Sequence, residues 1–357
     1  MKNQFNKQYD ATQSKLIKPV ICFGEALIDF LNTGSEKEGC LSLNNFRQYP
    51  GGAPANAAVA VAKLGGNAFF AGQVGNDMFG DFIESSLAAY QVDTRYLSKH
   101  PTAKTALAFV ALDQDGERTF SFHRENSADM LFSQNQVRSQ WFETPSILHF
   151  CSNTLTEKNI ELCTEYAVNT ALEANVTVSF DVNLRHNLWP NGKVEIGIIN
   201  NLIHRAHILK FSREEFDYLS NGNPEGYLAF CLNWNCQLLI ITDGAKPIVY
   251  HTKKFSDSVH PPITTAVDTT AGGDGFIGGV LFSISKFNQL SDVTENEGLL
   301  KNIIQFSAQC GAIAVSKSGA FPALATLEEV LPQLSPLPAA KMTIPTHSLD
   351  KIFGMAI

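Results

Sequence analysis

The segment 267–279, VDTTAGGDGFIGG, places a small-residue turn and an acidic residue at the start of an apolar helix. Glycines in such a turn let backbone N–H groups converge at a helix N-terminus, where partial positive charge favours an anion. We expect Ala271, Gly272 and Gly273 to form this cradle for a transferring phosphoryl group. Asp274 follows directly, where a base could take the proton of an attacking hydroxyl. An acidic residue is also favourable there without catalysis, but the whole string favours the catalytic interpretation.

A second glycine turn, GGAPAN, precedes an alanine-rich helical stretch. Gly51 and Gly52 permit close approach of the backbone to a ligand. Asn56 supplies two donors and an acceptor, which suit sugar hydroxyls. The alternative is a tightly packed helix start with Pro54 near its first position.

Polar residues also follow the carboxyl ends of apolar strands. Asp29 interrupts the run GEALIDFL, while Asp181 and Asn183 follow the strand TVSF. Ligands of open α/β sheets gather at this edge, so these side chains could accept bonds from a substrate. For Asp29 taken alone, a strand passing from core to solvent is the favoured explanation. Ser212 and Glu215 follow the strand HIL and fit a helix capping box, although Glu215 could also order water around Mg²⁺.

The elements that position these residues alternate between strands and helices, which predicts an open, mostly parallel α/β sheet with helices on both faces. Strands are expected at 19–24, 67–74, 147–151, 176–180, 207–209 and 237–242. Helices are expected at 51–64 after Pro54, 77–90, 157–173, 213–219, 272–285 and 299–316. The stretch 105–123 instead predicts two strands joined at Asp115–Gly116, and these could pair with 26–50 as a small separate sheet.

One domain over 19–335 accounts for this pattern, with a disordered tail at 1–18 and a proline-rich extension at 336–357. The 357 residues are 44% apolar and 17% charged, with a net charge of -8, which disfavours nucleic acid and anionic membranes as partners. The seven cysteines include no CxxC pair, and the polar amino terminus lacks the apolar core of a signal peptide. These features predict a reduced, cytoplasmic protein. The sequence contains no GxxxxGK[ST], HRD, DFG, HExxH or GxSxG motif.

Together these residues resemble the ribokinase-type (PfkB) family of sugar kinases, from about Pro19 to Leu331. GGAPANAAVAVAKLG is similar to the family's first signature, and VDTTAGGDGFIGG is similar to its second. The resemblance implies a ribokinase-like fold with a β-sheet lid, ATP and Mg²⁺ as cofactors, and Asp274 as the catalytic base. It also implies that two copies could pair through the lid.

The same resemblance implies roles for further residues. Those expected to bind the sugar are Asp29, Gly51, Gly52, Asn56, Arg124 in HRENSADM, Asp181 and Asn183. Those expected at the nucleotide or at Mg²⁺ are Ser212, Glu215, Thr242, Gly244 and Ala308. Asp268 and Thr270 match positions that hold a monovalent cation such as K⁺ in several members. Ser212 replaces the usual Asn of the family's NxxE motif and Pro247 replaces a Gly of TxGxxG, so the nucleotide pocket departs from the family pattern.

Within the family, CFGEALIDFL, SFDVNLRHNLWP and KFSREEFDYL are most similar to fructokinases. This implies transfer of the γ-phosphate of ATP to the primary hydroxyl of D-fructose. Aminoimidazole riboside kinases share much of this pattern, so a riboside kinase is the nearer alternative. A sugar-binding protein without catalysis is the farther one, although the intact Asp274 and glycine turn argue against it.

Overall fold

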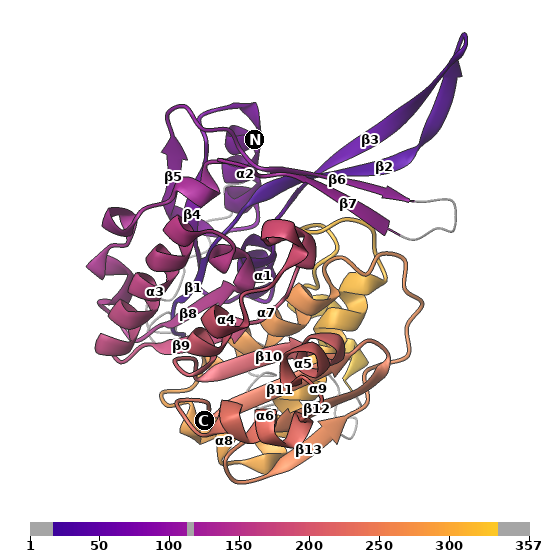
Figure 1. Ribbon diagram of the computed structural model, residues 1–357. Helices are drawn as coiled ribbons and strands as arrows, with labels where there is room; N and C mark the ends of the chain where they lie inside the picture. Colours follow the sequence, from indigo (N-terminus) through magenta and orange to yellow (C-terminus); the bar gives the residue numbers. More distant parts are fainter. Residues whose placement is uncertain (1–16, 113–117, 335–357) are drawn as a thin grey trace, which may run out of the picture.

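The computed structural model describes residues 17–112 and 118–334, so the expected turn at Asp115–Gly116, most of the amino-terminal tail and the extension 336–357 lie outside the described residues. Its body is a sheet in the order β13-β12-β11-β10-β9-β8-β1-β4-β5 (Figure 1). The strands are β1 (Val20–Phe23), β4 (Ala68–Gly75), β5 (Asp93–His100), β8 (Ile147–Cys151), β9 (Thr177–Asp181), β10 (Ile208–Ser212), β11 (Leu238–Asp243), β12 (Lys246–His251) and β13 (Ser256–Val259). From β5 to β11 the strands are parallel, whereas β12 runs antiparallel to both of its neighbours.

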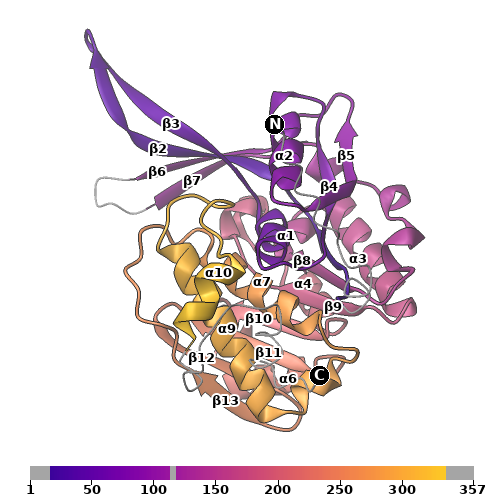
Figure 2. The same cartoon turned by 180° about the vertical axis from the view of Figure 1, so that it is seen from behind.

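Helices cover both faces of the sheet, as predicted, because successive buried residues of each central strand point to opposite faces. One core packs α3 (Lys158–Glu173), α4 (Ile196–Ile203), α5 (Arg213–Ser220) and α6 (Pro224–Leu232). The other packs α1 (Ala53–Lys63), α2 (Met78–Ala89), α7 (Gly272–Ile284), α8 (Ser291–Thr294), α9 (Glu297–Val315) and α10 (Leu327–Val330). Figure 2, seen from behind, brings α9 and α10 into view.

A second, four-stranded sheet has the order β3-β2-β6-β7 and confirms the predicted pairing of 26–50 with 105–123. Its strands are β2 (Leu27–Glu38), β3 (Leu41–Gly51), β6 (Leu107–Leu112) and β7 (Arg118–His123). The β2–β3 hairpin projects far from the body (Figure 1). Strand β2 begins shortly after β1, and β3 ends shortly before α1. The lid therefore joins the body at the predicted sugar-binding residues.

Small residues bring α1 and α7 close together. A side chain on Gly278 of α7 would collide with the Cβ of Ala60 in α1. The two helices therefore approach backbone to backbone, with their first turns side by side. This contact places the two glycine turns of the sequence, some two hundred residues apart, at one point.

The sequence pattern did not predict β5, β12, β13, α4, α6 or the short helices α8 and α10. Strand β5, DTRYLSKH, lies at the edge of the sheet and is only partly buried, so it lacks the apolar run of the central strands. Lys18, at the start of the described residues, donates its backbone N–H to the carbonyl of Ser285. Among the described residues, no helix is both long and apolar enough to cross a bilayer.

Candidate active site

Two predicted residues meet where α1 and α7 begin. Asn56 lies in the first turn of α1, and Asp274 lies in the first turn of α7. The Nδ2 amide of Asn56 donates to Oδ2 of Asp274 at 2.7 Å. Both side chains are almost fully buried, with 3% and 7% of their surface exposed. The structure thus joins the predicted sugar-binding amide directly to the predicted base.

The environment of Asp274 suits a proton acceptor. Burial raises the pKa of its carboxyl, while the hydrogen bond from Asn56 and the charges of Lys210 and Arg185 act in the opposite direction. The carboxylate is therefore held in a buried position from which most water is excluded. A base of this kind is more basic than an exposed aspartate and can accept a hydroxyl proton in the transition state.

The predicted anion-holding turn lies one residue before it. Within the described residues, no side chain caps the N-terminus of α7, and the N–H of Gly272 makes a long bond of 3.4 Å to the carbonyl of Thr269. A Cβ added to Gly272 would lie 2.5 Å from Cγ1 of Val315, which explains the glycine. Oδ1 of Asp268 accepts the N–H of Thr270 at 2.9 Å and fixes the turn from behind. The turn therefore has the form of an anion cradle.

Lys210 is a site residue to which the sequence pattern gave no role. It is buried in β10, opposite Asp181 of β9 in the strand register, and its Nζ donates to both carboxylate oxygens of Asp181 at 3.0 and 2.9 Å. A Cβ on Gly273 would lie 3.1 Å from this Nζ, so the ammonium group borders the anion-holding turn. Burial alone would lower the pKa of Lys210, but the carboxylates of Asp181 and Glu215 outweigh it and raise that pKa. The single charge in the apolar run HILKF was the available signal.

The structure accordingly places Asp181 in a buried ion pair under the turn. Asn183 follows it with a left-handed backbone (φ 40°), and its carbonyl accepts the hydroxyl of Ser152 at 3.3 Å. Both residues lie at the carboxyl edge of the sheet, as expected. Asp181 holds the ammonium group of Lys210 next to the turn at 271–273, while Asn183 shapes the loop that follows β9.

On the lid side, Asp29 packs directly on Gly51. The carboxylate of Asp29 occupies the space that a side chain at Gly51 would fill, and a Cβ on Gly52 would lie 2.5 Å from the backbone oxygen of Glu25. Burial raises the pKa of Asp29 to about 7, and the negative charges of Asp274, Asp268 and Glu25 act in the same direction. The negative charge of Asp274 therefore acts on the carboxyl of Asp29 across the space between the two glycine turns.

A buried network supports this side of the site. Oε1 of Glu25 accepts Nδ2 of Asn153 at 2.9 Å and the N–H of Ala53 at 3.2 Å, so it ties the start of α1 to the loop after β8. Arg124 pairs with Asp129 at 2.6 Å and donates to the carbonyl of Asn153 at 3.0 Å. Arg124 is thus built into the wall of the site. Glu25 was not singled out from the sequence, although it stands alone in an apolar run.

At the predicted nucleotide side, Ser212 and Glu215 form the capping box of α5. The carboxylate of Glu215 accepts the N–H of Ser212 at 2.7 Å and that of Leu184 at 2.8 Å, which links α5 to the loop after β9. Thr242 donates its hydroxyl to the carbonyl of Phe211 at 3.3 Å, and Gly244 has a left-handed backbone (φ 55°) just after β11. Ala308 is buried in α9, within the core.

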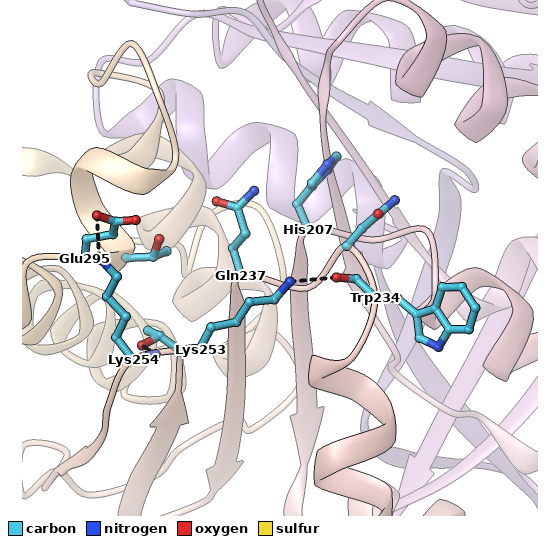
Figure 3. Close-up of a pocket in the computed structure, with 9 residues that line it drawn as sticks. His207, Trp234, Gln237, Lys253, Lys254 and Glu295 are labelled. Atoms are coloured by element: carbon cyan, nitrogen blue, oxygen red, sulfur yellow. Dashed lines mark hydrogen bonds and ion pairs between the residues drawn. The ribbon is translucent and has the colours of Figure 1, made fainter.

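Two pockets lie at opposite edges of the sheet, and one of them is next to this cluster. One of about 610 Å³ lies beside the end of the lid, lined by 122–125, 156–157 and 187–190, and shares Arg124 with the wall of the site. The other, of about 370 Å³, lies at the amino-terminal ends of β10 and β11, the edge opposite Asp274 (Figure 3). There Lys253 donates to the carbonyl of Trp234 at 2.8 Å and Lys254 pairs with Glu295 at 2.6 Å, so both ammonium groups already have partners.

Comparison with known proteins agrees with this geometry. Residues 18–327 match the model of the pfkB family carbohydrate kinases. "Probable fructokinase-5" of Arabidopsis thaliana is 38% identical over 309 residues, which cover 86% of this chain and 94% of the relative.

Two solved structures are similar over most of the chain. A fructokinase with bound ATP from Xylella fastidiosa is 40% identical, with a TM-score of 0.83, and the match covers 89% of this chain and 98% of that one. A double mutant of the fructokinase from Vibrio cholerae O395, in a form with fructose, ADP and potassium ion bound, is 31% identical, with a TM-score of 0.78 over 88% and 98%.

Proposed function

Because the chain belongs to the pfkB family of carbohydrate kinases, we propose that it transfers the γ-phosphate of ATP to the primary hydroxyl of D-fructose, with Asp274 as the base. It is an ATP-dependent phosphotransferase that acts on a sugar. The named relatives are fructokinases at 31% to 40% identity, which favours fructose as the acceptor. The observation that carries the proposed mechanism is the hydrogen bond between Asn56 and Asp274 beside an uncapped helix N-terminus.

In this mechanism, Asn56 and Asp29 hold ring hydroxyls and direct the primary hydroxyl toward Asp274. Asp274 takes the hydroxyl proton as the oxygen forms its bond to the γ-phosphorus and the bond to the ADP oxygen breaks. The backbone N–H groups of 271–273 and the neighbouring ammonium group of Lys210 would stabilise the negative charge of the transferring group, which is supported by the uncapped start of α7 and by the closeness of Lys210 to Gly273. ADP and fructose 6-phosphate are the products.

The donor set suits metal ions held chiefly by the nucleotide. Among the described residues, no group of three or more His, Cys, Asp or Glu side chains could hold a metal ion. Mg²⁺ commonly keeps several waters and binds through one or two carboxylates and substrate phosphates, so Glu215 would contribute through water. When bound, Mg²⁺ neutralises phosphate charge, and a monovalent cation near Asp268 and Thr270 would order the anion-holding turn.

A coupled ADP-release assay over a panel of sugars and ribosides tests this proposal. At fixed ATP, fructose should give a higher kcat/KM than ribose, aminoimidazole riboside or adenosine. A riboside that exceeded fructose by about tenfold would keep the kinase and change its substrate. The absence of ADP release with every acceptor would support the sugar-binding alternative instead.

A cytoplasmic location remains a prediction from the cysteine usage.

We also infer that two copies of the chain pair through the lid. The projecting β2–β3 hairpin exposes Leu41, Leu43 and Phe46 by 58%, 41% and 39%, and Phe46 keeps this exposure although its ring contacts that of Phe109. Phe46→Glu should lower the molar mass measured by light scattering from that of a dimer to that of a monomer. A monomeric wild-type protein would contradict this inference.

A further inference from the structure

Tyr49 occupies the place where the lid meets the anion-holding part of the molecule. In the β2–β3 register it is the direct partner of Asp29, so the two side chains share one face of the lid sheet. Only 9% of Tyr49 is exposed, and the guanidinium of Arg47 lies 5.3 Å from the centre of its ring. Because paired strands move together, a sugar that draws Asp29 inward would carry the Tyr49 ring with it.

The ring of Tyr49 lies against Gly319, in the loop that follows α9. A Cβ added to Gly319 would stand 2.6 Å from Cε1 and 2.9 Å from Cδ1 of the ring. Gly319 also has a φ of +90°, which side-chain-bearing residues rarely adopt. The glycine is therefore required by the ring and by the backbone, and the ring fills the space that a side chain at Gly319 would need.

Gly319 is bonded in turn to the anion-holding turn. Its N–H donates to Oδ2 of Asp268 at 3.1 Å, while Oδ1 of the same carboxylate accepts the N–H of Thr270 at 2.9 Å. Thr270 directly precedes the predicted cradle at 271–273. A displacement of Gly319 by the ring would thus be transmitted through one carboxylate to the backbone that faces the phosphate.

The far side of the loop is anchored, so the loop cannot simply retreat. Nζ of Lys63, at the end of α1, donates to the carbonyls of Phe321 at 3.3 Å, Pro322 at 3.1 Å and Leu324. Helix α1 therefore carries Asn56 in its first turn and holds the Gly319 loop through Lys63, the last residue of the helix. Tyr49 therefore contacts a loop that is attached both to α1 and to the turn that precedes α7.

We propose that Tyr49 is a positioning residue that couples closure of the lid over the sugar to the anion-holding turn, through Gly319 and Asp268. The inference rests on the proposed sugar and nucleotide sites but adds a relation between them. The coupling predicts binding synergy, in which each substrate tightens the binding of the other. The reason is that closure of the lid, which moves the Tyr49 ring, and ordering of the anion-holding turn occur in the same conformational state.

Calorimetric titration tests this directly. The affinity for a non-hydrolysable ATP analogue is measured with and without saturating fructose in wild type, Tyr49→Phe and Tyr49→Ala. Fructose should tighten analogue binding by about fivefold or more in wild type and in the phenylalanine variant, and by less than about twofold in the alanine variant. A wild type without synergy, or an alanine variant that keeps it, would overturn the proposal. Complete loss of fructose binding in Tyr49→Ala would also overturn it, since Tyr49 would then belong to the sugar site.

A second pair of variants addresses the contact itself. Gly319→Ala should lower kcat because its methyl group meets the ring, and Gly319→Ala/Tyr49→Ala should recover part of that loss because the ring is gone. Losses that simply multiply would contradict the contact as the route of coupling. If Gly319→Ala does not fold, as judged by thermal unfolding, the titrations of the Tyr49 variants decide alone. Wild-type ADP release with fructose is measured first, so failure of the kinase proposal is seen separately from failure of the coupling.

Discussion

Asn56 Nδ2 lies 2.7 Å from Asp274 Oδ2, and this hydrogen bond spans the first turns of two helices that are 218 residues apart in the chain. In the proposed mechanism, one amide thereby orients both the sugar and the base that acts on it. The bond also stabilises the ionised form of Asp274 against the burial that raises its pKa. Several consequences of this arrangement can be measured.

Replacing Asn56 by Ala should shift the pH dependence of kcat to higher pH. Without the amide, the pKa of Asp274 rises further, so the base is protonated over a wider range and the acid limb moves upward. The kcat/KM for fructose should also fall, by about 1–3 kcal/mol in transition-state free energy, because a buried polar partner is lost. An unchanged acid limb would show that the limb reports a group other than Asp274.

Variants at Lys210 and Asp181 can separate a structural role of Lys210 from a catalytic role of the same residue. Lys210→Met leaves the buried carboxylate of Asp181 unpaired and should destabilise the fold by about 3–5 kcal/mol. Lys210→Met/Asp181→Asn should recover most of that stability in denaturant unfolding. If Lys210 also acts on the transferring phosphate, kcat should remain low in the double variant. Recovery of kcat together with stability would assign Lys210 a purely structural role.

The raised pKa of Asp29 predicts how the use of fructose depends on pH. Its pKa of about 7 means that the carboxyl is protonated below that pH, so kcat/KM for fructose should fall as pH decreases through 7. Stability follows the opposite direction. From about pH 4 to 7, the folded protein holds a proton that the unfolded chain releases, so stability decreases as pH rises through this window.

Asp29→Asn is the matched control for this test. The difference in unfolding free energy between wild type and Asp29→Asn, measured at pH 5 and pH 8, removes the contribution of all other groups. The wild type should lose stability relative to the variant at pH 8. A difference that is constant with pH would contradict the raised pKa.

A monovalent cation should activate the enzyme. Asp268 holds Thr270 and Gly319 at the back of the anion-holding turn, and K⁺ bound near it would order that turn. We expect kcat/KM to be higher in K⁺ than in a bulky organic cation at matched ionic strength. Equal values in the two salts would show that the turn is ordered without a cation.

The central sheet and the lid could be predicted because their strands are continuous apolar runs or joined pairs with a clear period. The edge elements could not: β12 and β13 are short antiparallel strands whose half-exposed residues carry little pattern. Among the site residues, Asp274 and Asn56 were predictable because each follows a glycine turn at a helix start. Their direct contact was not, because it depends on how closely Gly278 lets α7 approach α1.

Other residues required tertiary structure. Lys210 resembles any interior charge in a strand until its register opposite Asp181 and its distance from Gly273 are known. The alternative of a capping box at Ser212 and Glu215 is present in the structure, and only the fold shows that Glu215 also holds Leu184. Tyr49 carries no sequence signal, because the glycine that it contacts lies 270 residues further along the chain.

The most direct test of the mechanism is the turnover of Asp274→Asn with fructose and ATP, next to Asp81→Asn, which removes an exposed carboxylate on α2. The account predicts that kcat of Asp274→Asn falls by about 10²- to 10⁴-fold, because the proton of the sugar hydroxyl has no acceptor in the transition state. Fructose affinity, measured by calorimetry, should change little, and Asp81→Asn should match wild type. An Asp274→Asn variant that kept more than about a tenth of the wild-type kcat would contradict Asp274 as the base.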